Sequence, residues 1–342
     1  MSDPFVFDHK RLFNEPTMEQ HGSHMIIKNV HKPEKTKYLT IDTRFRDQYD
    51  TSLLANYNIT LPERVNSVKS MKALQLEMPL SYHNISASLG NNSFQLTNST
   101  STEVFTLDDD FYPTVDGTLG IAPRINSKLS GASSVTGISI VIDPTTGKIT
   151  FSNTNTVDVT ITFDNVDCTG GGTPKGGLSD RESLMSKLGW LLGFRLPSYT
   201  IPKKAGGVNG TLTGEAIADA TGIPYFYLIV DEFKNSNPHS FLGLSRTSQL
   251  SSQQILARIT VDTSSYNVGV SANDVPIGTA GSFGYGPQIM AVGDNDNMIS
   301  DTRTYGELVD IQKMNVRIVD QFGRIMNFNG LDFSFLLELK HE

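Results

Sequence analysis

The sequence predicts an all-β protein, built as an antiparallel β-sandwich with a small inserted α+β module. Apolar residues alternate with polar ones along the last segment, residues 309–340, which is the period of a strand. Short apolar runs elsewhere are separated by turn residues, and Gly, Asn, Ser and Thr are abundant. Only 19% of the 342 residues are charged, which disfavours long solvated helices. The length suits one large β domain or two smaller ones.

The final segment has the clearest pattern in the chain. Met314, Val316 and Ile318 fall on one side of an extended strand, and a second alternating run follows the Asn329-Gly330 pair. Asn-Gly between two such runs predicts a β-hairpin. The second run places these residues on one face: Phe333, Phe335, Leu337 and Leu339. Their burial would contribute roughly 6–12 kcal/mol, so we expect a central strand of the core.

The main domain is expected to comprise residues 36–91 and 201–342. Its first part contains strand patterns at residues 37–46, 56–61 and 65–78, with Pro62 ending the second strand and a bulge in the third. Its second part contains strand patterns at residues 225–233 and 254–261, followed by a long polar loop at residues 262–304. Short polar connections between strands are typical of antiparallel folds.

Residues 92–200 have a different character and are expected to form the inserted module. Residues 94–96 and 104–107 predict a hairpin, and further strands are expected at residues 138–142, 148–151 and 159–163. Apolar spacing predicts helices at residues 115–129, despite Pro123, and at residues 179–192, where Ser179 and Glu182 have the spacing of a capping box. Residues 1–35 show no sustained period and are expected to form an extended N-terminal arm.

Composition narrows the function. The net charge is −8 and the isoelectric point is near 5.4, so nucleic-acid binding is not expected. Cys168 is the single cysteine, which excludes an internal disulfide and fits a reducing compartment. No apolar run approaches the length of a transmembrane segment, and the N-terminus lacks the apolar core of a signal peptide. We expect a protein without a transmembrane segment.

Two loops invite a binding-site interpretation. The glycine-rich residues 169–177 contain Lys175, but that lysine precedes Gly176 and no hydroxyl follows in register, so a phosphate-binding loop is not indicated. Residues 294–297 and Asp301 carry oxygen ligands, yet the sixth and twelfth positions of a calcium loop hold Ile299 and Tyr305. An irregular calcium site is the alternative. Residues 108–110 are interpreted as a solvated turn.

Catalytic chemistry has little support. Outside the N-terminal arm (His9, His21, His24 and His31) and the C-terminus, the only histidines are His83 and His239, both near turn signals. No combination of Ser, His and Asp stands out. We therefore expect no enzyme activity, no catalytic residues, no metal and no cofactor. The apolar residues 188–195, which include Trp190, are expected to be core of their own module.

Five segments, taken together and in this order, resemble penton and other minor capsid proteins of nucleocytoplasmic large DNA viruses, the giant viruses. They are residues 38–46 (YLTIDTRFR), 188–195 (LGWLLGFR), 225–233, 254–261 and 310–339. The resemblance implies a jelly roll of eight antiparallel strands with an insertion, within an icosahedral shell. It also implies a homopentamer at the five-fold vertex that contacts neighbouring major capsid protein and other minor capsid proteins.

The resemblance thus predicts a structural protein of the virion capsid, assembled in the host cytoplasm. Two alternatives stay open: a minor capsid protein away from the vertex, and a glycan-binding host-attachment module that uses the insertion or the long loop. A capsid subunit needs a rigid sandwich whose edges meet neighbours, which the strand pattern and the arm satisfy.

Overall fold

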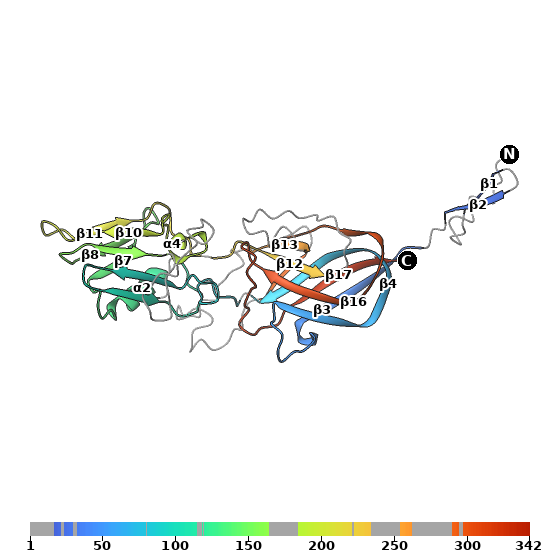
Figure 1. The fold of residues 1–342 in the computed structure, drawn as a ribbon, viewed down its shortest axis with the longest axis horizontal. Coiled ribbons are helices and arrows are strands. Elements are labelled where there is room, and N and C mark those ends of the chain that lie inside the picture. Colours follow the sequence, from blue (N-terminus) through green and yellow to red (C-terminus); the bar gives the residue numbers. More distant parts are fainter. Residues whose placement is uncertain are drawn as a thin grey trace.

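A computed structural model describes residues 17–21, 24–29, 33–79, 81–114, 118, 120–163, 184–220, 222–233, 254–261, 289–293 and 297–342 (Figure 1). Its elements are mostly antiparallel strands, so the predicted all-β class is confirmed. The strands of the main domain are β3 (Lys35–Asp42), β4 (Asn56–Pro79), β12 (Tyr225–Asp231), β13 (Ile255–Thr260), β14 (Ile289–Gly293), β15 (Met298–Ser300), β16 (Arg303–Val319) and β17 (Ser334–His341).

These strands form one eight-stranded sheet in the order β15-β13-β12-β16-β4-β17-β3, with β14 paired to β4. β4 and β16 are long, at 24 and 17 residues, and the sheet is curled (Figure 1). Its strands share the main cluster of buried apolar residues. The first half of β4 pairs with β16, and its second half pairs with β17 and β14. The result is a jelly-roll-like architecture in which the long strand β4 pairs with different neighbours along its two halves.

The C-terminal strand is central, as predicted. β17 pairs with β3 on one side and with β4 on the other. Phe335, Leu337 and Leu339 are buried in the main core, and Phe333 packs there just before the strand begins. Met314, Val316 and Ile318 of β16 share that core. The period of two therefore identified the correct buried face of both strands.

The predicted hairpin at Asn329-Gly330 is wrong. Both residues have positive φ, of 53° and 77°, and the amide of Leu331 donates to the carbonyl of Phe328, so a tight turn does form. The flanking strands do not pair, however, because β4 lies between β16 and β17. Asn-Gly determines a local change of direction, whereas the strand that fills the adjacent position comes from much earlier in the chain.

The predicted break at Pro62 is also wrong, since β4 is continuous through it. The register between β4 and β16 shifts between the pairs Val65↔Ile311 and Thr60↔Lys313. Pro62 lies in this irregular stretch, where some residues of β4 make no regular hydrogen bond to β16. The missing N–H of the proline is therefore tolerated. The predicted bulge further along β4 is confirmed by a second register shift.

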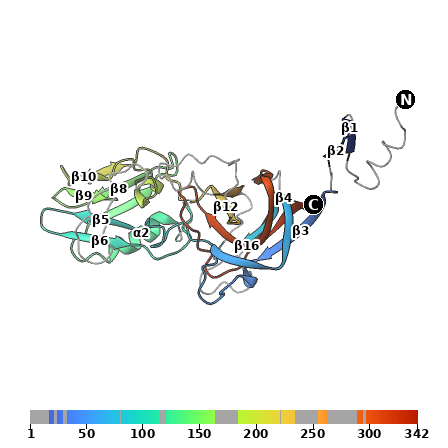
Figure 2. The same ribbon diagram turned by 45° about the vertical axis from the view of Figure 1, so that its right-hand side comes forward.

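The second part of the structure has its own core and lies beyond one end of the curled sheet (Figure 2). One sheet has the order β10-β9-β5-β6 and another the order β11-β8-β7, and two short helices accompany them. The elements are β5 (Ser93–Thr97), β6 (Thr102–Thr106), α2 (Ile121–Ser130), β7 (Ile138–Ile142), β8 (Ile149–Asn153), β9 (Val159–Thr162), α4 (Leu188–Leu191), β10 (Ser198–Ile201) and β11 (Gly210–Thr213). The core of this part includes residues from Ile85 to Ala220. We propose these limits for the module, which are wider than the expected 92–200.

The first predicted helix is shorter than expected, and the second is interrupted at Lys187 in its described part. α2 begins at Ile121 rather than at residue 115, which places Pro123 in the first turn, where its missing N–H has no intrahelical partner to lose. α4 covers only Leu188–Leu191, with Lys187 in an extended conformation before it. Ser179 and Glu182 lie outside the described residues.

Two further segments differ from expectation. The predicted loop at residues 262–304 contains, in its described part, β14, β15 and the start of β16. The arm contains an antiparallel hairpin of β1 (Thr17–His21) and β2 (His24–Asn29), drawn apart from the curled sheet (Figure 1). An isolated two-stranded hairpin is only marginally stable in water, so this hairpin is suited to pairing with another surface.

Candidate functional site

The connection between β3 and β4 is held by many hydrogen bonds at the surface of the main sheet. It begins with a 3-10 turn, η1 (Thr43–Phe45), which Asp42 caps by accepting a hydrogen bond from the amide of Arg44 at 2.9 Å. The Arg44 guanidinium also donates to the Asp42 carboxylate. This hydrogen bond lowers the pKa of Asp42 below its ordinary value, against the opposing effect of partial burial.

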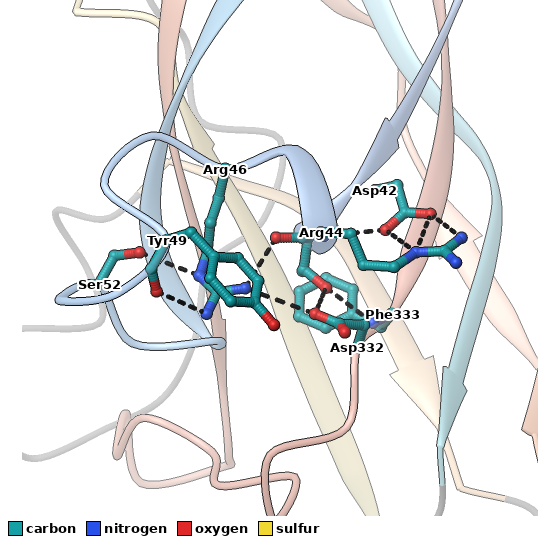
Figure 3. Close-up of polar contacts among 8 residues, drawn as sticks. Asp42, Arg44, Arg46, Tyr49, Ser52, Asp332 and Phe333 are labelled. Atoms are coloured by element: carbon teal, nitrogen blue, oxygen red, sulfur yellow. Dashed lines mark hydrogen bonds and ion pairs between the residues drawn. The ribbon is translucent and has the colours of Figure 1, made fainter.

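Arg46 holds the loop together from inside (Figure 3). Its side chain is only 6% exposed. The guanidinium donates to the Thr43 carbonyl at 2.8 Å, to the Tyr49 carbonyl at 3.1 Å and to the Ser52 hydroxyl at 3.0 Å. It also stacks on the Tyr49 ring, 4.0 Å from the centroid. One planar cation therefore satisfies three acceptors spread over ten residues.

The loop is joined to the segment that leads into β17. Thr43 exchanges two backbone-directed hydrogen bonds with Phe333, each of 3.0 Å, through its amide and its hydroxyl. The Thr43 hydroxyl donates to Asp332 at 2.8 Å, and Arg46 lies 3.4 Å from the same carboxylate. Figure 3 shows these contacts converging from both ends of the chain. The loop conformation therefore depends on the C-terminal segment being in place.

On its other side the loop extends the sheet. The amide of Asp47 donates to the Asn58 carbonyl at 2.8 Å. The Asp47 carboxylate accepts from the Thr60 amide at 3.1 Å and from the Thr60 hydroxyl at 2.7 Å. Gln48 has a positive φ of 53°, an unfavourable conformation that is retained because its carbonyl accepts from Thr51 and Ser52. The backbone of this loop is thus pre-organised.

This fixed backbone presents large apolar side chains to solvent. Phe45 is 75% exposed, Tyr49 is 53% exposed and Leu53 is 61% exposed. We name these three residues the loop patch. Exposed apolar residues on a rigid backbone are typical of binding surfaces, because little conformational entropy is lost when they are covered. The arrangement is suited to contact with another macromolecule.

A second polar cluster is buried. Arg303 of β16 donates to Glu232 at 2.7 Å, to the Val230 carbonyl at 2.7 Å and to the Gln254 carbonyl at 2.9 Å. The Arg303 and Glu232 side chains are 5% and 0% exposed. Burial raises the pKa of the neighbouring Tyr305 hydroxyl. The cluster joins β12, β13 and β16, although Oε1 of Glu232 and the hydroxyl of Tyr305 are buried without a hydrogen-bond partner in the described part of the chain. Its position between three strands of the sheet gives it an architectural role.

The loop motifs singled out in the sequence do not converge on a site. Residues 169–177, with Lys175, lie outside the described residues, as do Asp294 and Asp296. Asp301 accepts a hydrogen bond from the Thr302 amide. Asp108 and Asp110 form ion pairs with Lys128 and Arg124 at the surface, so this exposed segment is also bonded to α2. In the described part of the chain, no group of three potential ligands could hold a metal ion.

Several of the histidines and Trp190 lie in the described part of the chain. His83 lies 2.7 Å from the Asn329 amide, whereas His239 and His31 fall outside the described residues. His21 and His24 occupy paired positions in the β1–β2 ladder. Arg195 stacks over Trp190 at 4.1 Å. Around it, Leu188, Leu192 and Phe194 are buried in the module, which confirms the core interpretation of this stretch.

The loop patch was missed by sequence reasoning. Phe45 continues the alternation of Ile41, so the pattern assigned it to a strand, yet β3 ends at Asp42. Asp42 could have predicted the end of the strand, since Asp is a favoured N-cap residue at the start of a helical turn. No pattern in the sequence predicts that the side chains of Tyr49 and Leu53 are exposed. No helix in the described ranges has the length and hydropathy needed to cross a membrane.

Comparisons with known proteins give distant similarity only. No protein-family model and no curated protein matches the sequence. Among solved structures, the chain is similar to the mavirus penton protein, with 9% identity and a TM-score of 0.42, over 91% of this chain and 100% of that chain. It is also similar to a chain of the Sputnik virophage structure, with 14% identity and a TM-score of 0.37, over 91% and 98%. These values are too low to carry an argument, and neither protein points specifically to nucleocytoplasmic large DNA viruses.

Proposed function

We propose that this chain is a structural capsid protein of an icosahedral DNA virus, and specifically the penton that forms a homopentamer at the five-fold vertices. The observation that carries this proposal is the curled eight-stranded antiparallel sheet built around β17. A jelly-roll-like sheet of this kind is a common scaffold of viral capsid domains.

The segments that carry the sequence resemblance support the proposal. Four of the five lie in the main sheet, where they include most or all of β3, β12, β13, β16 and β17. The fifth, residues 188–195, forms α4 and its buried surroundings in the module. Resemblance and fold therefore coincide in the same core positions, which is where a shared architecture would impose shared residues.

The surface supports a role in assembly. A capsid subunit must present surfaces to several neighbours. The module and the N-terminal hairpin lie at opposite ends of the curled sheet (Figures 1 and 2), and the loop patch is exposed after β3. We assign the proposed penton to the virion, with major capsid protein and other minor capsid proteins as further partners. A nucleocytoplasmic large DNA virus is the origin that the resemblance favours.

The decisive experiment is native mass spectrometry of the full chain, alone and mixed with the major capsid protein of its virus. Pentamers, or a defined complex with capsid protein, are expected. A monomer with measurable affinity for glycans in an array would instead favour the attachment-module alternative. A cryo-EM map of the particle that places the chain away from the vertices would favour the non-vertex minor capsid protein.

A further inference from the structure

The loop patch borders one edge of a five-strand layer within the main sheet. In this layer the first half of β4 pairs with the second half of β16, and the layer continues through β12 and β13 to β15. On the other side of β4, β17 pairs only from Val68 onward. Beside Asn58 and Thr60 that position is taken by Asp47 of the loop. The loop and β15 therefore lie at opposite edges of the layer.

The β15 edge has its own partly exposed patch. Ile299 is 58% exposed, whereas its neighbours Met298 and Ser300 are buried, so Ile299 is on the outer face. It pairs with Arg258 of β13, whose guanidinium stacks on the ring of Tyr225 at 4.1 Å. We name Tyr225, Arg258 and Ile299 the edge patch. Aromatic residues and arginine beside an aliphatic residue form the composition that dominates binding energy at protein interfaces.

The charges beside the two patches are complementary. Asp50 is exposed within the loop, and Arg258 is a cation of the edge patch. Arg44, whose guanidinium is paired with Asp42, is exposed next to Phe45, and Asp301 is exposed two residues after Ile299. Contact between two loop patches would bring the Asp50 carboxylates of two copies together. Contact between a loop patch and an edge patch would instead place Asp50 near Arg258, which matters for copies that each carry a net charge of −8.

We infer that the loop patch of one copy docks on the edge patch of the next copy, in a head-to-tail contact between identical chains. This inference rests on the proposed homopentamer and names its subunit interface. Two different surfaces at opposite edges of one layer make a heterologous contact, and repetition of such a contact closes a ring when the rotation per subunit allows it. The apolar side chains supply the buried area, and the flanking charges set the orientation.

Cross-linking tests the contact directly. The variant carries Tyr49→Cys and Ile299→Cys in a Cys168→Ser background, and a short bis-maleimide is the cross-linker. Four inter-strand steps separate β4 from β15, about 19 Å, so a shorter linker joins these positions only between copies. A ladder of covalent species that ends at the closed ring is expected. Dimers formed by either single-cysteine variant would indicate a symmetric contact and overturn the head-to-tail inference.

Charge exchange provides the second test, read by analytical ultracentrifugation. Asp50→Arg and Arg258→Asp are each expected to weaken assembly by about tenfold or more, and the double variant to recover most of the loss. Val208→Asp is the matched control, because Val208 is 71% exposed in the module, away from both patches. Wild-type protein that stays monomeric would refute the proposed pentamer. Wild-type pentamers that respond to neither charge change nor cross-linker would refute only this interface.

Discussion

The guanidinium of Arg46 lies 3.4 Å from the carboxylate of Asp332, although 286 residues separate them in the chain. Thr43 bridges the same pair of segments through its hydroxyl. The loop that presents Phe45, Tyr49 and Leu53 is therefore held by Asp332, which lies two residues before the last strand. The loop can keep this conformation only when the segment leading into β17 is in its folded position.

Replacement of Arg46 by Ala is expected to lower the free energy of unfolding by about 1–3 kcal/mol, because carbonyl and hydroxyl acceptors in the loop lose a largely buried donor. Urea denaturation measures the loss, and limited proteolysis should cut within residues 43–55. Arg44→Ala is the control, since that side chain is 67% exposed. Equal losses in the two variants would contradict the role given to Arg46.

Leu337→Ala is expected to cost roughly 2–5 kcal/mol, because Leu337 is fully buried in the main core on the central strand β17. The neighbouring Leu336 is only half-buried and points to the opposite face, so Leu336→Ala should cost clearly less. Thermal unfolding of both variants compares the two faces. The assignment of the buried face would fail if Leu336→Ala were the more damaging change.

Arg303→Met is expected to cost about 3–5 kcal/mol, because it leaves the buried Glu232 carboxylate without its cation. Adding Glu232→Met should restore part of the stability, since no unpaired charge then remains. Arg64→Met is a matched control: the pair that Arg64 forms with Asp310 is exposed and should contribute little. If the double variant lost as much as the sum of the single ones, the two residues would not be coupled.

Gly189→Ala tests close packing in the module. A Cβ at Gly189 would lie 2.4 Å from Cγ of Phe163, so overpacking should cost about 1–3 kcal/mol. Gly306→Ala in β16 has no atom within 4 Å of the new Cβ and serves as the control. Near-ultraviolet circular dichroism during heating, which reports on Trp190, is the measurement. An unchanged module transition would show that Phe163 moves aside freely.

The pKa of Asp42 is lowered in the folded protein, so its carboxylate stabilises the fold at pH values above its unfolded pKa, about 3.9. That contribution is lost as the pH falls through the lower, folded pKa. Asp42→Asn should therefore be less stable than the wild type near neutral pH, with a difference that shrinks below about pH 4. Urea midpoints across this range are the measurement, and a difference independent of pH would contradict the assignment.

Local periodicity was sufficient where one face of a strand is buried. The alternation of Phe335, Leu337 and Leu339 identified the core face of β17 because the side-chain period of a strand is invariant. The same reasoning failed at Asn329-Gly330 and at Pro62. In both cases the outcome depends on which distant strand occupies the adjacent position in the sheet, and no local pattern encodes that.

The loop patch shows a different kind of limit. Phe45, Tyr49 and Leu53 are apolar, so a residue-by-residue analysis assigns Phe45 to the interior. Their exposure arises because Arg46 and Asp47 are bonded inward, to the loop carbonyls and to Thr60. In this loop the polar side chains point toward the protein and the apolar side chains point toward solvent, the reverse of the usual arrangement. This arrangement can be recognised only once the positions of the partners Thr60 and Asp332 are known.

The position of β17 has a consequence for biosynthesis. It fills the space between β3 and β4 but follows every other strand of the sheet in chain order. While the ribosome is still translating, β3 has no neighbour, and Thr43 and Arg46 lack their contacts with residues 332 and 333. The module, whose core is complete once Ala220 has emerged, can fold earlier. The proposed docking of the loop patch on another copy is therefore expected only after β17 has been translated.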